Sequence, residues 1–279
     1  LTLSGMPAWT KLTTSGTPPA SLVSHSAVHD PVHDRIVIFR GGSFSTSAPN
    51  EVWELSLAGS GAWTQLTPSG SPPPIRSGQS AIYDPARGRM VLFAGYGPFG
   101  YPFSDMWELT LGDSPAWNLL QATTGLYRSN HSAIYDPISD RMIVFGGYNG
   151  ATTATNELWA LPLANISAAI GLGPDGLPPG ERASHSAVYD AGGGRMLVFG
   201  GFGPSPTDAE VWAWQIPGTL AVPPGTTGPG ARLAAAFPNP ALGEVTLGFA
   251  LPAAGVASLR IYDVSGRLVR TVVDGELTA

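Results

Sequence analysis

The sequence predicts an all-β protein built from a short repeated sheet, and two observations lead to that prediction. The composition is rich in turn-forming residues, with 36 Gly and 27 Pro, yet 43% of the residues are hydrophobic. One pattern of 52 to 54 residues also recurs in phase four times along the chain. Many short strands that each bury a face, joined by tight turns, account for both observations.

Each repeat is marked by a Ser-Ala segment, an Arg-led apolar run and a tryptophan. The serines stand at 26, 80, 132 and 186, with steps of 54, 52 and 54. The downstream tryptophans Trp53, Trp107, Trp159 and Trp212 keep steps of 54, 52 and 53. A second series of Trp9, Trp63 and Trp117 keeps steps of 54 and then stops, with Ala169 in the next place. Several landmarks in phase indicate genuine internal repetition.

The landmarks predict four strands, A to D, in each repeat. The Ser-Ala-Val/Ile-Tyr segment is strand A, and the Arg-Met-Val-Leu-Phe type of run is strand B. An Asp-Pro turn joins them, because Pro fixes φ and Asp caps its own backbone. Strands C and D carry the two tryptophans. A glycine pair after strand B allows positive φ or close backbone approach. Since so small a sheet cannot bury its faces alone, neighbouring repeats must stack.

These residues resemble the kelch family, through the glycine doublet, the Trp of strand C and the second Trp on strand D. The period also suits kelch blades better than the roughly 40–45 residues of WD40. The resemblance covers residues 1–216 and implies a kelch-type β-propeller of the galactose oxidase-like superfamily. Ala94 replaces the first glycine of the second doublet.

The fourth repeat has strands A to C but no strand D. Kelch rings usually hold roughly five to seven blades, so we expect the four recognisable blades to form an incomplete ring. The alternative is a four-blade ring in which Trp9-Thr-Lys-Leu supplies the missing strand. The chain opens inside a repeat, without an initiator Met or a signal segment, so we expect that processing removed them or that the chain is a fragment.

A different pattern follows a Gly/Pro/Thr-rich linker at 217–232. Phe237-Pro-Asn-Pro precedes three strand-like runs, with Ser265-Gly266 as a hairpin turn. This part resembles the C-terminal sorting domain of the type IX secretion system and the immunoglobulin-like module of FlgD-type proteins. The resemblance implies a partial immunoglobulin-like β-sandwich at 233–279, bacterial secretion machinery as a partner, and an extracellular or outer-membrane surface location.

Composition and charge exclude several classes of function. A net charge of -6 with only 12% charged residues offers no basic field for nucleic acid. No apolar run approaches the roughly 20 residues of a transmembrane helix. The absence of cysteine removes disulfides, thiolate catalysis and Cys-ligated zinc. It also removes the galactose oxidase activity that the resemblance would otherwise suggest, because that family's cofactor needs a Cys–Tyr crosslink.

The repeated polar residues are better explained by structure than by chemistry. His25, His131 and His185 share one repeat position with Gln79, and such positions are spread around an axis instead of converging on a metal. We therefore expect hydrogen bonds to neighbouring blades and no metal site. An aspartate also recurs five residues before an arginine in every repeat, which predicts an ion pair closing each A–B hairpin. These pairs are Asp30–Arg35, Asp84–Arg89, Asp136–Arg141 and Asp190–Arg195.

The candidate ligand-binding residues lie where the repeats vary, on the face formed by the B–C and D–A loops. The B–C loops, at 43–50, 97–104, 149–155 and 203–207, differ in length and carry aromatic residues. An arginine stands three residues before the His/Gln position of repeats two to four. It binds either the interblade carbonyls or a polar ligand such as a glycan or peptide. The candidates are Arg76, Arg128, Arg182, Tyr96, Tyr148, Phe202, Phe99 and Tyr101.

The function that follows is a secreted or surface-displayed, non-catalytic binding protein for a protein or carbohydrate ligand. We expect no catalytic residue and no cofactor. The rival is a glycan-active hydrolase or lyase that uses Asp105 or Asp208 at the mouth of the propeller. An intracellular adaptor is disfavoured, because no helical partner domain is evident and the resemblance of the tail to a sorting domain implies export.

Overall fold

The computed structural model describes 9–20, 24–40, 50–98, 100–150, 153–173, 176–204 and 210–217, and in the tail the backbone of four strands. All regular structure in these residues is β. Within them there is no helix with the length and hydropathy to span a bilayer.

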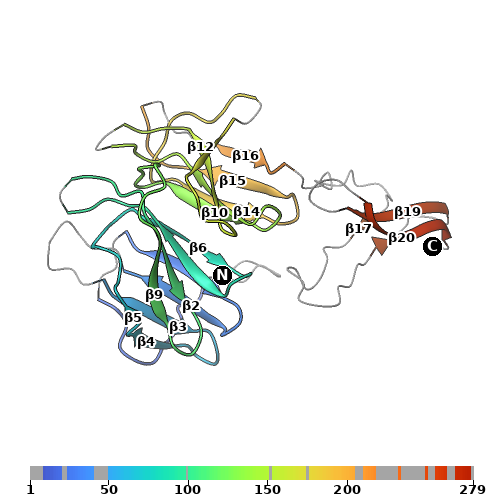
Figure 1. Cartoon of the computed structure of the whole chain (residues 1–279). Helices are drawn as coiled ribbons and strands as arrows, with labels where there is room; N and C mark the ends of the chain where they lie inside the picture. The colour runs from blue at the N-terminus through green and yellow to red at the C-terminus, as the bar shows by residue number, and fades with distance from the viewer. Residues whose placement is uncertain are drawn as a thin grey trace.

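Four antiparallel sheets, the blades of a propeller, follow one another along the chain (Figure 1). Blade 1 contains β1 (Ser26–Asp30), β2 (Arg35–Phe39), β3 (Val52–Ser56) and β4 (Ala62–Leu66). Blade 2 contains β6 (Ser80–Asp84), β7 (Arg89–Phe93), β8 (Met106–Thr110) and β9 (Ala116–Gln121), and β5 (Ser69–Gly70) pairs in parallel with β9. Blade 3 contains β10 (Ser132–Asp136), β11 (Arg141–Phe145), β12 (Leu158–Pro162) and β13 (Ile170–Leu172). Blade 4 contains β14 (Ser186–Asp190), β15 (Arg195–Phe199) and β16 (Val211–Gln215). The predicted strands A to D are thus confirmed in blades 1 to 3, and A to C in blade 4.

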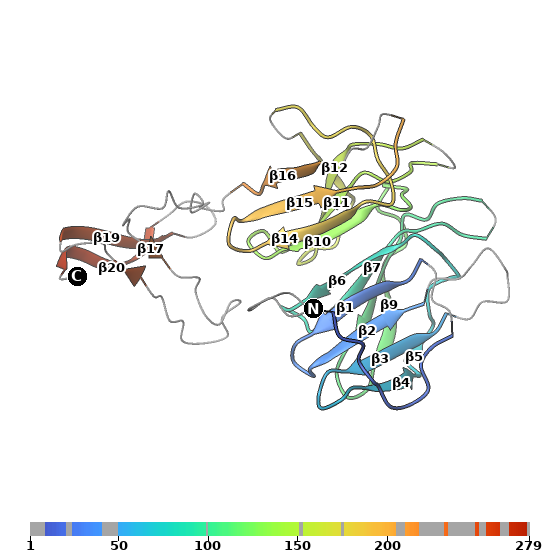
Figure 2. The same ribbon diagram turned by 180° about the vertical axis from the view of Figure 1, so that it is seen from behind.

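The core lies between the blades. The first strands β1, β6, β10 and β14 lie side by side in that order, as the reverse view shows (Figure 2). Each blade presents one apolar face to the next blade, which we call its leading face, and the opposite trailing face to the previous blade. On blade 3 the leading face carries Ile134, Phe145 and Leu158, which pack on Met196 and Val198 of blade 4. Equivalent clusters join blades 1 and 2 and blades 2 and 3.

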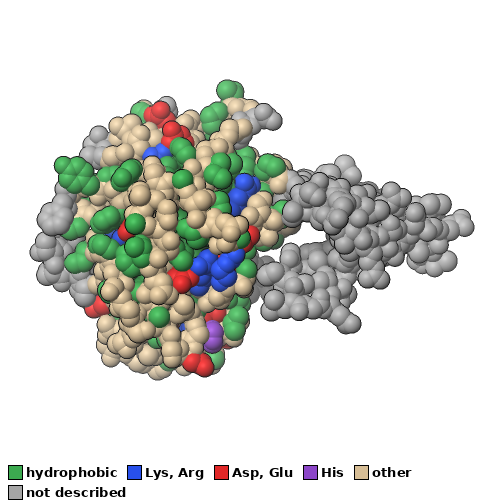
Figure 3. Space-filling model, in the orientation of Figure 1, with side chains coloured by type: hydrophobic (Ala, Val, Ile, Leu, Met, Phe, Trp, Pro, Cys, Tyr) green, Lys and Arg blue, Asp and Glu red, His purple; other side chains and the backbone are tan. Residues whose placement is uncertain are grey.

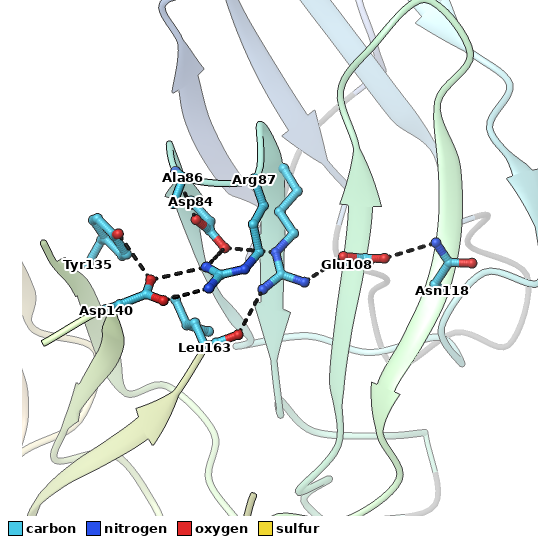
Figure 4. A network of polar contacts seen from close by, with 9 residues as sticks. Asp84, Ala86, Arg87, Glu108, Asn118, Tyr135, Asp140 and Leu163 are labelled. Carbon is cyan, nitrogen blue, oxygen red and sulfur yellow. Dashed lines mark hydrogen bonds and ion pairs between the residues drawn. The ribbon is translucent and has the colours of Figure 1, made fainter. Parts of the chain in front are cut away.

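The predicted Asp–Arg pairs close all four A–B hairpins, with Nε–Oδ2 distances of 3.0, 2.8, 2.8 and 2.8 Å. In blade 2 the pair extends into a network across the blade boundary (Figure 4). Arg89 binds Asp84, Glu108 and the Leu163 carbonyl of blade 3. Arg87 reaches Asp140 of blade 3 through both terminal nitrogens. The repeated acids therefore brace the scaffold.

The leading face of blade 4 is uncovered. Val188, Phe199 and Val211 are 50%, 47% and 67% exposed. Their counterparts Ile134, Phe145 and Leu158 on blade 3 are 5%, 4% and 5% exposed. Among the described residues, the four blades form an array with one open end, as expected for an incomplete ring.

The N-terminal segment does not complete blade 4, so the four-blade ring closed by Trp9–Leu12 is not what the structure adopts. Trp9 and Leu12 are 88% and 69% exposed. The following Ser15 forms a parallel bridge to Ala62 in blade 1, where Ser15 N donates to the Gly61 carbonyl at 3.0 Å. In the described residues, β16 is an edge strand.

The described part of the tail consists of two antiparallel strand pairs. β17 (Arg232–Leu233) pairs with β18 (Phe249–Ala250), and β19 (Gly255–Tyr262) pairs with β20 (Leu268–Leu277). The expected Ser265-Gly266 turn and the side chains of this part lie outside the described residues. The sandwich and the sorting-domain assignment therefore stay predictions.

Candidate binding face

In blades 2 to 4 the D–A and B–C loops meet at one end of the sheet through backbone bridges. Ser77 pairs with Tyr96 in blade 2, Ser129 with Tyr148 in blade 3, and Ala183 with Phe202 in blade 4. Each bridge joins the residue after a candidate arginine to a candidate aromatic residue. The predicted arginine and aromatic positions are therefore neighbours in the backbone.

The side chain of Arg76 is buried at 1% exposure. Its Nη1 and Nη2 donate to the two carboxylate oxygens of Asp105 at 2.7 and 2.8 Å. Nη1 also donates to the Ala94 carbonyl at 2.8 Å, and the guanidinium lies 4.3 Å from the ring centroid of Phe103. A guanidinium with its carboxylate, carbonyl and ring partners already in place has a structural role.

Arg128 and Arg182 occupy the same place in blades 3 and 4, at 4% and 2% exposure. Arg128 forms an ion pair with Glu157. Burial lowers the pKa of Arg128, because it disfavours the charged guanidinium. Arg182 donates to the carbonyls of Gly180 and Gly200 at 3.1 and 3.2 Å. These carbonyls belong to the arginine's own blade, so these contacts brace each blade internally.

The aromatic candidates differ in exposure. Tyr101 and Phe202 are 77% and 71% exposed, whereas Tyr96 and Tyr148 are half-buried. Phe99 lies outside the described residues. Figure 3 shows hydrophobic side chains scattered over the propeller with few charges among them. Exposed aromatic residues on loops of variable length are the described features best suited to contact a partner.

An acidic residue two positions before each strand C tryptophan accepts a hydrogen bond from that indole, a pattern the sequence analysis missed. Trp107 Nε1 donates to Asp105 at 2.7 Å, and Trp212 Nε1 donates to Glu210 at 2.9 Å. Glu51 and Glu157 bind Trp53 and Trp159 at 3.0 and 3.1 Å. The constant spacing was the available signal. This spacing aligns Asp105 with Glu210 and not with Asp208. Asp208 lies outside the described residues.

Two of the three repeated histidines, His131 and His185, bridge blades as predicted, whereas His25 is exposed. His131 Nε2 lies 2.7 Å from Ser80 Oγ, and His185 Nε2 lies 2.7 Å from Ser132 Oγ. Burial lowers the pKa of His131 to about 3 and that of His185 to about 4. Across the described residues, no three metal-binding side chains gather in one place.

The family follows from the repeat array. The model of the Attractin/LZTR1 beta-propeller matches residues 5–210, which include blades 1 to 3 and the first two strands of blade 4. The chain belongs to this family. The assignment agrees with the kelch resemblance of the repeats.

Curated relatives share part of the array. Multiple epidermal growth factor-like domains protein 8 of Homo sapiens is 26% identical over 183 residues, which cover 59% of this chain and 6% of that protein. The flagellar outer arm dynein alpha chain of Chlamydomonas reinhardtii is 25% identical over 191 residues, covering 60% of this chain and 4% of that protein. The matched regions are thus small parts of much longer proteins.

Among solved structures, that of YjhT superposes with a TM-score of 0.53 at 12% identity. The superposition covers 86% of this chain and 72% of YjhT. At this identity the likeness concerns the fold alone.

Proposed function

We propose that the propeller is a non-catalytic module that binds a protein ligand through the loops that carry Tyr101 and Phe202. The observation that carries the proposal is a difference between the charged and the aromatic side chains. The repeated charged residues are largely engaged within the scaffold, whereas two aromatic side chains of the variable loops are more than two-thirds exposed. Membership of the Attractin/LZTR1 beta-propeller family supports a role in protein binding.

The chemistry of these loops suits a polar surface with a few aromatic anchors. Aromatic residues are enriched at protein interfaces, and a few such anchors supply most of the binding free energy. A carbohydrate ligand is the other class that fits an aromatic mouth, and the experiment below distinguishes the two.

The non-catalytic assignment is supported by the state of Asp105. Its two oxygens are bound by Arg76, and one of them also accepts from Trp107. A carboxylate fixed by three donors is poorly placed to exchange a proton with substrate.

We further propose export to the cell surface through the C-terminal part, where β19 and β20 pair as the sorting-domain resemblance leads one to expect. Fractionation of cells that express the chain with the sorting machinery tests it. Accumulation at the surface, lost when 233–279 is deleted, supports export, whereas the same distribution with and without the tail contradicts it.

The binding proposal is tested by presenting the labelled chain to protein and glycan arrays. We expect a protein ligand that is recovered chemically intact after incubation. A ligand confined to the glycan array would replace the protein class by carbohydrate. Cleavage of the ligand, read by mass spectrometry and abolished in a folded Asp105→Asn variant, would favour the hydrolase or lyase instead.

A further inference from the structure

An apolar cavity lies between blades 3 and 4, beside the edge strand β16. Its walls include Phe145, Leu158, Pro179, Met196, Val198 and Trp214, and the cavity has a volume of about 70 Å³ and opens to solvent.

The same place between blades 1 and 2 is filled by a tryptophan of strand D. Trp117 on β9 is 3% exposed and packs in one cluster with Phe39, Met90, Leu92 and Leu109. Its indole meets Phe39 edge-on, with the ring centroids 5.3 Å apart. The walls of the two sites correspond by repeat position, so the cavity is the site of a strand D tryptophan.

The loop beside each site is held by the same hydrogen bond from an asparagine side chain to a proline carbonyl. Asn156 Nδ2 donates to the Pro179 carbonyl at 3.1 Å, and Asn50 makes the same bond to Pro73. Blade 4 therefore offers a preformed wall and a strand edge, the two parts that β-strand addition uses.

The chain carries a segment of the required sequence. Trp9-Thr-Lys-Leu repeats Trp63-Thr-Gln-Leu, which forms β4 in blade 1. Trp63 stands opposite Leu55, and Leu66 opposite Val52. The same register on β16 would set Trp9 opposite Trp214 and Leu12 opposite Val211. Trp9 and Leu12 are exposed in their own chain.

We propose that two copies of this chain associate head to tail, with Trp9–Leu12 of one copy paired with Val211–Trp214 at the edge of β16 in the other, and with Trp9 seated in the cavity between blades 3 and 4. Blade 4 of the copy that accepts the strand then packs against blade 1 of the copy that donates it, as each blade packs against the next within one chain.

The two ends of the array carry matching halves of the blade interface. At the boundary between blades 2 and 3, and again between blades 3 and 4, a serine is hydrogen-bonded to a histidine of the following blade. Ser186 on blade 4 and His25 before blade 1 stand at these positions, and both are exposed. Leu57 of blade 1 is 40% exposed, whereas its counterparts Leu111 and Leu163 are 1% and 2% exposed. Contact between the ends would therefore continue the existing interblade interface, a heterologous arrangement that yields rings or chains.

Because the chain lacks cysteine, a crosslink tests the strand register directly. Thr10 would face Ala213 across the added strand, at a separation compatible with a disulfide. The chain with Thr10→Cys and Ala213→Cys should oxidise to intermolecular dimers or larger species on a non-reducing gel. A matched chain with Thr10→Cys and Leu119→Cys should not. Consumption of both thiols at unchanged mass would overturn the proposal in favour of closure within one chain.

Mixing variants tests the polarity of the contact. Trp9→Ala should remove the donor, and Val211→Asp should remove the acceptor at a position that is exposed in the single chain. Light scattering should find each variant monomeric alone and a one-to-one dimer in the mixture, while Leu119→Asp should associate as the original chain does. A monomeric original chain at every concentration, or failure of the mixture to dimerise, would overturn the head-to-tail contact.

Discussion

Ser80 Oγ of blade 2 and His131 Nε2 of blade 3 lie 2.7 Å apart in a buried hydrogen bond. Ser132 and His185 repeat this bond at the next boundary. In the second repeat Gln79 takes the histidine position, and there Ser26 Oγ donates to the Gln79 backbone carbonyl at 3.0 Å. The position therefore tolerates an uncharged amide side chain.

Acid should destabilise the propeller through these histidines. The folded-state pKa of His131, about 3, lies below its ordinary value of 6.5, so the unfolded chain binds the proton first. Stability is fully present above about pH 6.5 and falls as the pH drops toward 3. The free energy of unfolding should decrease by about 2 kcal/mol per buried histidine at about pH 5.

Urea unfolding of His131→Gln against pH measures this dependence. The variant should lose part of the acid sensitivity, because glutamine does not titrate. His25→Gln, at an exposed position, is the matched control and should keep the full dependence. An identical pH profile for His131→Gln and the original chain would contradict the assignment.

Trp117 should be among the most costly side chains to truncate. It is buried between blades 1 and 2, so Trp117→Ala should lower the free energy of unfolding by about 3–5 kcal/mol. Tyr101→Ala, at a side chain 77% exposed, should change it by less than about 0.5 kcal/mol. Trp107 is half-buried, so Trp107→Ala should fall between them. Denaturant midpoints give the order, and a neutral Trp117→Ala would disprove the packing described for blade 2.

Asp105 should behave as a structural residue. Its carboxylate pairs with a guanidinium that is fully buried, so Asp105→Asn should cost about 3–5 kcal/mol through the charge left on Arg76. Adding Arg76→Met should recover part of that loss, because the unpaired charge is then absent. A double-mutant cycle on thermal unfolding measures the coupling. A stable Asp105→Asn variant with no coupling to Arg76 would reopen a chemical role for this carboxylate.

The linker between the propeller and the tail should be the first site of proteolysis. Residues 217–232 are rich in Gly and Pro, and the propeller that precedes them has its own core between blades. Limited digestion followed by mass spectrometry should yield a resistant fragment that ends within this linker. Cleavage first inside the blades would contradict the domain boundaries.

The strands and their pairing were predictable because the repeat shows the same pattern four times. Ser26, Asp30, Arg35 and their counterparts keep one spacing, and hairpin register follows directly from such spacing. The histidine bridges were also predictable, because residues at one repeat position are spread around the axis of the propeller. They cannot meet at a single metal ion, so a hydrogen bond to the neighbouring blade was the expected role.

The role of Arg76 was harder to predict from sequence. Its partner Asp105 is 29 residues away, and the sequence left a ligand and the scaffold open as alternatives. Which aromatic residues are exposed depends on how each loop folds, so Tyr101 and Tyr96 look alike in the sequence and differ in the structure. The cavity beside β16 becomes visible only when blade 4 is compared with blade 2 in three dimensions.

The most direct test of the binding face is the affinity of the ligand found on the arrays for two matched variants. Tyr101→Ser and Leu119→Ser each remove one exposed apolar side chain, the first at the mouth of the propeller and the second on β9. Calorimetric titration should show at least about a tenfold weaker Kd for Tyr101→Ser, the loss expected for an interface anchor. Leu119→Ser should bind as the original chain does, and both variants should keep its melting temperature. Equal affinity of Tyr101→Ser and the original chain would contradict the claim that this loop binds the ligand.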